Sequence, residues 1–186
     1  MNGNFRRYSA VRNRRGLTGA QAAEAVLWAN GVRDVAIRPV RGSLTDHYDP
    51  RDNTIYLSET VYAADTVAAV GVAAHEAGHA VQYAVGYAPV RLRSAIVSVT
   101  NLSSQASMVL LFIGLFLYSQ TFFGIGTLLF SVTTFFQLGT LPVEFNASRR
   151  AMETIESQGL LDAEEAQGAG RVLKAAAMTY VAALLT

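Results

Sequence analysis

The sequence predicts a mainly α-helical protein that combines a long apolar helical hairpin with a smaller α+β unit. The hairpin is predicted by residues 94–143, which contain no charged side chain and are strongly apolar in their centre. A second apolar stretch, residues 65–86, is rich in alanine and predicts a buried helix of about twenty residues. Two short strand-like runs precede this helix and predict a short β-hairpin.

The composition limits the chemistry that the chain can perform. Its 186 residues fit a single domain, residues 1–186. The chain has no cysteine, so disulfide bonds and cysteine-bound metals are excluded, and any metal must use histidine and carboxylate ligands. The formal net charge is only +1, and no basic stripe is interleaved with aromatic residues. We therefore expect no nucleic-acid partner.

The N-terminal part divides into a basic segment and a first helix. Residues 1–17 carry five arginines and lack the apolar core of a signal peptide, so we expect a solvated tail or a contact with anionic lipid headgroups. Thr18 and Gln21 have the spacing of a capping box, which predicts a helix from there to about Ala29. Asn30 and Gly31 are typical of a helix end.

Two strands and a turn are predicted next. Residues 35–40 and 54–57 are rich in β-branched and aromatic side chains and are separated by the polar residues 46–53. Aspartate, proline and asparagine in residues 46–53 favour a turn. We therefore expect a short β-hairpin, and the strand 54–57 could pair with an extended peptide.

The predicted buried helix contains His75, Glu76 and His79 in an HExxH pattern, with Asp65 as its expected N-cap and Gly86 as its expected end. Histidines four residues apart lie on one face of a helix and can bind one Zn²⁺. The glutamate between them can then act as general base toward a water molecule. The alternative is that all three side chains are buried and that each has its own hydrogen-bond or ion-pair partner. One metal ion would provide a partner for all three together.

Residues 94–143 are long enough for two membrane-spanning helices joined near residues 119–121. A buried hairpin in a soluble protein is the alternative. The positive-inside rule places both ends of the hairpin, and with them the HExxH helix, on the cytoplasmic side. The arginines that support this orientation are Arg91, Arg93, Arg149 and Arg150.

A zinc site needs a third protein ligand, and the residues alone leave two candidates open. Glu144 is the first charged residue after the uncharged span, and His47 is the remaining histidine of the chain. A last helix is predicted from Asp162, because Asp162 and Glu165 are typical of a helix start.

Three motifs together give a resemblance to a known family. The segments HEAGHAVQ, PVEFNASRRA and LTDHYDPR resemble the YugP-like neutral zinc metallopeptidases of bacterial membranes. More distantly, the chain is similar to HtpX-like gluzincins, in which a glutamate from a later helix completes a zincin-like site. The resemblance implies that His75, His79 and Glu144 bind Zn²⁺ and that Glu76 is the catalytic base.

The resemblance leaves two details to this sequence. HtpX-like proteins usually carry Ala-Asp where this chain has Ala147 and Ser148, so Ser148 would offer a ligand histidine only a weaker hydrogen bond. His47 or Tyr48 could stabilise the oxyanion of a tetrahedral intermediate. The alternative is that the surrounding aspartates only build a tight turn.

These observations predict a zinc-dependent membrane endopeptidase of the bacterial plasma membrane, multi-pass, with its active site facing the cytoplasm. Its substrates would be proteins or peptides, among them membrane proteins, and its other partner the lipid bilayer. The alternative is a catalytically silent scaffold or adaptor with a structural zinc. The sequence leaves the oligomeric state open. The expected parts are residues 1–17 (basic segment), 18–93 (zincin-like part), 94–143 (transmembrane hairpin) and 144–186 (third-ligand helix and last helix).

Overall fold

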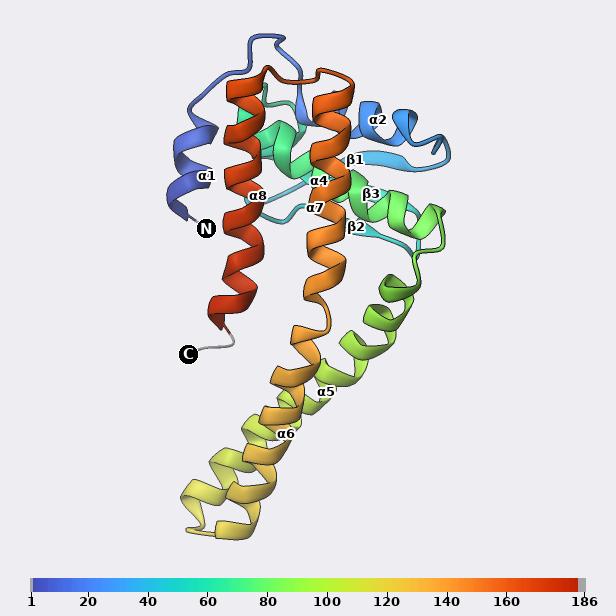
Figure 1. Ribbon diagram of the computed structural model, residues 1–186. Helices are drawn as coiled ribbons and strands as arrows, with labels where there is room; N and C mark the ends of the chain where they lie inside the picture. The colour runs from blue at the N-terminus through green and yellow to red at the C-terminus, as the bar shows by residue number, and fades with distance from the viewer. Residues whose placement is uncertain (1, 184–186) are drawn as a thin grey trace. The chain divides into compact units, whose positions relative to one another are not determined.

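The computed structural model describes residues 2–183, which form mainly helices and one small sheet (Figure 1). The mainly helical fold class is thereby confirmed. The helices are α1 (Asn2–Ser9), α2 (Gly19–Ala29), α3 (Glu59–Tyr62), α4 (Val67–Ala84), α5 (Ala88–Phe116), α6 (Gln120–Leu138), α7 (Leu141–Ser157) and α8 (Ala163–Ala183). The strands are β1 (Ala36–Val40), β2 (His47–Asp49) and β3 (Thr54–Ser58).

The chain forms two compact units. The first, which we call the sheet unit, comprises Met1–Tyr87 and Glu144–Thr179. The second, the hairpin unit, comprises Ala88–Val143 and Tyr180–Thr186. The sheet unit contains the HExxH motif and Glu144. All residues predicted to bind the metal or to take part in catalysis therefore belong to one unit.

A short β-hairpin precedes α4 as predicted, but β2 and β3 form it, and the predicted strand at residues 35–40 is not one of its two strands. Strand β3 is central: β1 pairs with it in parallel and β2 pairs with it antiparallel, so the strand order is β1-β3-β2. The two predicted strands are therefore parallel neighbours, and the residues predicted as a turn contain β2. The predicted antiparallel pairing of residues 35–40 with residues 54–57 was wrong, because residues 41–53 are long enough to return the chain to the start of the sheet, which a parallel pair requires.

Helix α4 forms the centre of the sheet unit. Ile55 and Leu57 of β3, Val26 of α2 and Ile155 of α7 belong with α4 to one buried apolar core. The N-cap is Thr66, whose hydroxyl accepts a hydrogen bond from Ala69, one residue after the predicted cap. The predicted end at Gly86 is confirmed: its φ is 65°, and Tyr87 N–H donates to the Gln82 carbonyl in the pattern of a Schellman motif.

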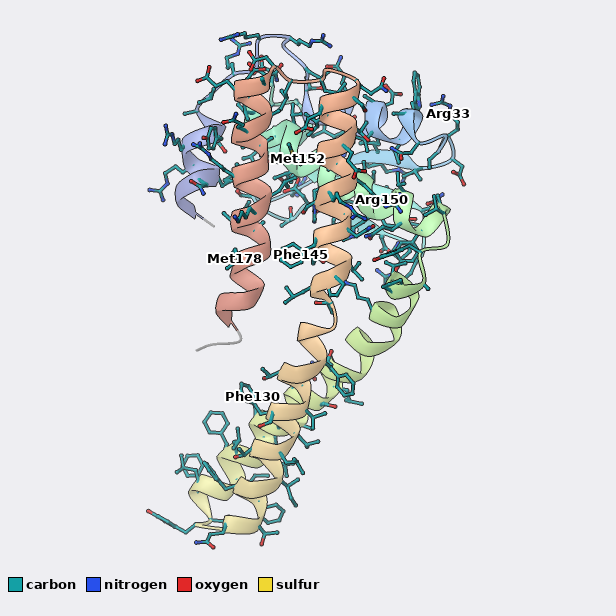
Figure 2. All side chains as sticks on the ribbon, viewed as in Figure 1. Arg33, Phe130, Phe145, Arg150, Met152 and Met178 are labelled. Carbon is teal, nitrogen blue, oxygen red and sulfur yellow. The ribbon has the colours of Figure 1, made fainter. Side chains whose placement is uncertain are left out.

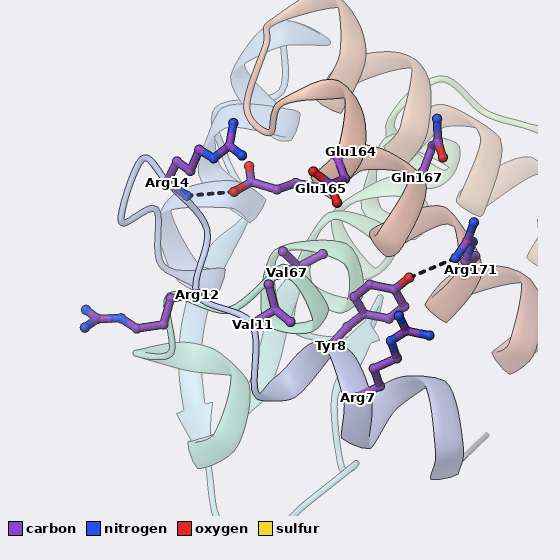
Figure 3. A pocket seen from close by; sticks show the side chains of 10 residues that line it. All are labelled: Arg7, Tyr8, Val11, Arg12, Arg14, Val67, Glu164, Glu165, Gln167 and Arg171. Carbon is purple, nitrogen blue, oxygen red and sulfur yellow. Dashed lines mark hydrogen bonds between the residues drawn. The ribbon is translucent and has the colours of Figure 1, made fainter.

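The basic N-terminal segment is folded against the rest of the sheet unit. Residues 2–9 form α1, which the sequence did not predict, and Asn13 is buried between the Leu17 and Asp65 carbonyls to which its amide donates. Figure 3 shows the Arg14 backbone donating to Glu165, and Arg171 donating to the Tyr8 hydroxyl, around a surface pocket. Tyr8, Asn13 and Arg14 thus attach the segment to the fold, while the side chains of Arg12 and Arg14 are mostly exposed, and the expected contact with lipid headgroups stays a prediction.

The capping box at the start of α2 is formed as predicted. The Thr18 hydroxyl accepts from the Gln21 backbone, and the Gln21 side chain accepts from the Thr18 backbone. We expect Thr18→Ala to lower the free energy of unfolding by about 0.5–2 kcal/mol, whereas Thr18→Ser should retain most of it. Chemical denaturation of the three proteins measures this difference, and equal midpoints for Thr18→Ala and the wild type would contradict it.

The hairpin unit contains α5 and α6, which residues 117–119 join, two positions before the predicted connection at residues 119–121. The helices approach closely at Gly114 and Gly126: a Cβ at Gly114 would lie 2.5 Å from the Phe123 backbone nitrogen. Many large apolar side chains of both helices are exposed, Phe116 and Leu128 among them. Within the part of the chain that the structure describes, no helix is long and apolar enough to span a membrane. Because α5 and α6 are joined by a short connection, the predicted helical hairpin is confirmed. The two predicted membrane crossings are not confirmed.

Candidate metal site

Two helices bring the predicted metal ligands together. His75 and His79 lie on α4, and Glu144 lies in the first turn of α7. The Glu144 Oε2 atom is 3.2 Å from Nε2 of His75 and 3.5 Å from Nε2 of His79. The ligand atoms of all three side chains lie within 4.8 Å of one another. Among the described residues, this is the group of histidine and carboxylate side chains that could hold a metal ion.

The close approach of α7 to α4 depends on small residues between the two histidines. A Cβ at Gly78 would lie 2.5 Å from the carbonyl oxygen of Ala147, so α7 approaches α4 more closely than any other residue type at position 78 allows. Ala77 and Ala147 are fully buried in the same region. The absence of a side chain at Gly78 thus allows the Ala147 carbonyl of α7 to lie against the turn of α4 that carries the two histidines.

The residues fit a zinc ion. Glu144 is only 4% exposed and His79 only 7%, and a buried carboxylate needs a charged or hydrogen-bonding environment. Two imidazole nitrogens and one carboxylate oxygen are a donor set that zinc uses in catalytic sites, where a fourth position is left for water or substrate. The position of Glu144 in the first turn of α7 also favours its negative charge, because the helix dipole is positive there.

The second ring nitrogen of each histidine has a polar side chain beside it. The Nδ1 atom of His75 lies 3.1 Å from the Ser148 hydroxyl, and that of His79 lies 3.0 Å from Oε1 of Gln82. Such contacts fix the ring orientation of metal-binding histidines. They leave both Nε2 atoms directed at Glu144. The predicted contact between Ser148 and a ligand histidine is therefore present, at His75.

Glu76 is directed toward strand β2. Its Oε2 atom accepts a hydrogen bond of 3.1 Å from the backbone N–H of Tyr48. Burial raises the pKa of Glu76, and the negative charge of Glu144 acts in the same direction. A carboxylate with a raised pKa exchanges protons more readily near neutral pH than an ordinary glutamate does.

Tyr48 and His47 lie on β2 with different surroundings. The Tyr48 hydroxyl donates to Asn53 over 2.7 Å, its ring lies against Tyr83, and burial raises its pKa to about 12. The Tyr48 backbone, rather than its phenol, contacts the site. His47 is exposed and stacks on Tyr56, with its Nδ1 atom 2.8 Å from the Thr45 carbonyl. The predicted roles of both side chains in oxyanion binding, and of His47 as a ligand, stay predictions.

The position of β3 changes one expectation about substrate. Strand β3 is paired on both sides, so its backbone is not the edge at which an extended peptide could be added. The two edges of the sheet belong to β1 and β2, and of these two strands β2 contacts Glu76 through the Tyr48 backbone.

Sequence reasoning did not place Gln82, Asn146 or Arg150 at the metal site. The Gln82 side chain is fully buried and donates to Oδ1 of Asn146, which also accepts from Arg150. One signal was available: Gln82 follows His79 by three residues in a helix that is otherwise apolar, so the two side chains share a face. Their partners on α7 could not be found from spacing.

An HExxH helix joined by a buried glutamate from a later helix defines a class, that of zinc-dependent metalloproteins with a hydrolase-type site. The chain belongs to the family described as "Putative neutral zinc metallopeptidase", whose model matches residues 1–186. The predicted family resemblance and the zinc cofactor are thereby confirmed.

One curated relative is similar over almost the whole chain. It is the "Putative membrane protease YugP" of Bacillus subtilis (strain 168), which is 48% identical over 182 residues. The match covers 98% of this chain and 81% of the relative. No solved structure matches the chain.

Proposed function

We propose that the protein is a zinc-dependent endopeptidase that hydrolyses peptide bonds with Glu76 as general base. One observation carries the proposal: a buried His75, His79 and Glu144 group, with ligand atoms within 4.8 Å of one another, adjoins Glu76 on the same helix. The family description supports the reaction class. The zinc ligands would be His75, His79 and Glu144.

The reaction requires a nucleophile, a base and an acid. Zinc held by His75, His79 and Glu144 would supply Lewis-acid activation of a water molecule and of the peptide carbonyl. Glu76 takes a proton from the attacking water, whose oxygen bonds to the carbonyl carbon. The carbon–nitrogen bond then breaks, and Glu76 returns the proton to the departing amine nitrogen. The hydrogen bond from Tyr48 N–H holds the Glu76 carboxylate in place, and the raised pKa makes that carboxylate a stronger base toward the attacking water.

The substrate is a protein or peptide in extended conformation. Strand β2 is the edge strand that contacts Glu76, so a backbone added at that edge would lie beside the proposed base. Backbone pairing depends little on side chains. We therefore expect the enzyme to select substrates whose backbone is accessible, more than substrates with one particular side chain.

The proposed location is the bacterial plasma membrane, with the active site on the cytoplasmic side. The hairpin unit exposes large apolar side chains, including Phe112, Leu115 and Leu128, and a patch of that kind is typical of contact with lipid or with another protein. The relative from Bacillus subtilis is named a "Putative membrane protease", and this supports the same location. The lipid bilayer and membrane-protein substrates follow as partners. Co-sedimentation with anionic vesicles tests the location, and full recovery in the supernatant would contradict it.

The test of the function uses the purified full chain in detergent. Zinc-loaded protein is incubated with a mixed peptide library, and cleavage products are identified by mass spectrometry. We expect cleavage that disappears when a chelator removes the metal and returns when zinc is restored. Binding of one equivalent of zinc without any cleavage would contradict the proposal and favour a scaffold with a structural zinc.

A further inference from the structure

We propose that Arg150 fixes the tautomer of His79 through a polar relay of Asn146 and Gln82, and that this makes Gln82 a positioning residue of the metal site. The relay joins the two helices that supply the ligands. This proposal rests on the proposed role of His79 as a zinc ligand. It adds an explanation of how the Nε2 lone pair of His79 is kept available for the metal.

The contacts of the relay form one unbroken line. His79 Nδ1 lies 3.0 Å from Oε1 of Gln82, and Nε2 of Gln82 donates to Oδ1 of Asn146 over 2.9 Å. The same oxygen accepts a 2.9 Å hydrogen bond from Nε of Arg150. Arg150, labelled on α7 in Figure 2, also lies over the ring of Tyr87 at the end of α4.

The direction of every hydrogen bond follows from the arginine. A guanidinium group donates and never accepts, so the atom of Asn146 that faces Arg150 must be the amide oxygen. That oxygen can only accept, so Gln82 must present its NH₂ group to Asn146 and its oxygen to His79. The Gln82 oxygen in turn requires a proton on Nδ1 of His79. In the neutral ring the Nε2 atom, 3.5 Å from Glu144, then carries the lone pair that a metal needs.

Burial makes this polarity strict. The Gln82 side chain is fully buried and Asn146 is only 8% exposed, so water does not offer their polar atoms easy alternatives. A reversed amide would place like atoms against each other in a buried site, which costs the full desolvation of those groups.

The second histidine provides a contrast within the same site. His75 faces the hydroxyl of Ser148 through its Nδ1 atom, 3.1 Å away. A hydroxyl both donates and accepts, so it fits either tautomer of the neutral ring. The relay therefore acts on His79 alone, and we expect the two histidines to differ when the metal is absent.

The first test reads the tautomer directly in the metal-free wild-type protein. Two-bond ¹H–¹⁵N correlation spectra of ¹⁵N-histidine-labelled protein, recorded where imidazoles are neutral, locate the ring proton of each of the three histidines. His47→Gln and His75→Asn assign the signals. We expect the His79 proton on Nδ1, and a proton on Nε2 would overturn the proposal without recourse to any relay variant.

The second test breaks and preserves the relay. Gln82→Leu removes both polar ends of the amide, and we expect mixed tautomers at His79 and a zinc Kd about 10- to 100-fold weaker, measured by competition with a chelator. Asn146→Asp keeps an oxygen acceptor for both donors, and it should retain the wild-type tautomer and Kd. A purely structural role would lower the unfolding temperature of Gln82→Leu and leave the tautomer unchanged, which would overturn the proposal.

These readouts are independent of peptide cleavage. The tautomer is measured without metal or substrate, and the Kd without substrate. A protein that binds zinc through this relay but cleaves no peptide would contradict the proposed function and leave the relay standing. Peptide cleavage by a protein whose His79 carries its proton on Nε2 would contradict the relay and leave the proposed function standing.

Discussion

Glu76→Gln should reduce peptide cleavage by about 10²- to 10⁴-fold, the contribution typical of a positioned general base, while zinc binding stays unchanged. The amide has the size of the carboxylate and can still accept the hydrogen bond from the Tyr48 backbone. It cannot take a proton from water, so the loss falls on kcat. Steady-state kinetics and zinc titration of the purified variant measure both quantities.

The matched control is Glu156→Gln, which makes the same chemical change at an exposed position of α7. We expect wild-type kinetics from it. A second comparison, His79→Ala, should lose zinc as well as cleavage. A Glu76→Gln protein that cleaves at the wild-type rate would show that another group acts as base.

Gly78→Ala should weaken zinc binding and lower the free energy of unfolding. The new methyl group would lie 2.5 Å from the Ala147 carbonyl oxygen, a backbone atom, so α7 must move away from α4. Overpacking of this kind costs about 1–3 kcal/mol. Because Glu144 lies on α7 and the histidines lie on α4, the same displacement separates the three ligand atoms. Zinc titration and chemical denaturation of the variant measure the two effects.

Gly170→Ala is the control for this variant, because it adds the same methyl group to another helical glycine of the sheet unit. Its Cβ would meet only the Met152 side chain, 3.6 Å away, which is an ordinary contact. We expect unchanged zinc binding and a free energy of unfolding that rises by as much as about 1 kcal/mol, because alanine favours a helix over glycine. If Gly78→Ala behaved like Gly170→Ala, the close approach of the helices would not be needed for the site.

The hairpin illustrates what hydropathy alone can and cannot establish. The absence of charge over residues 94–143 predicts two joined apolar helices, and α5 and α6 form them. Exposed apolar side chains such as Phe116 agree with contact to something other than water. The sequence pattern does not identify the partner, because lipid and protein interiors select the same side chains. The proposed bilayer contact is therefore left to the vesicle experiment.

The local sequence by itself determined the helices with strong end signals and the motif that carries the chemistry. The capping box at Thr18, the end of α4 at Gly86 and the HExxH spacing all depend on residues within a few positions of one another. Such contacts are fixed once the backbone is helical, so spacing is enough to predict them.

Only the tertiary structure decided the parts that depend on distant segments. The pairing of β1 with β3, the approach of Glu144 to both histidines, and the contact of Asn146 with Gln82 join residues that are far apart in the chain. Neither periodicity nor capping specifies such pairs. The two contacts at the metal site result from the packing of α7 against α4, which the absence of a side chain at Gly78 permits. The sequence predicts which residues could bind the metal, and packing places them within reach of one ion.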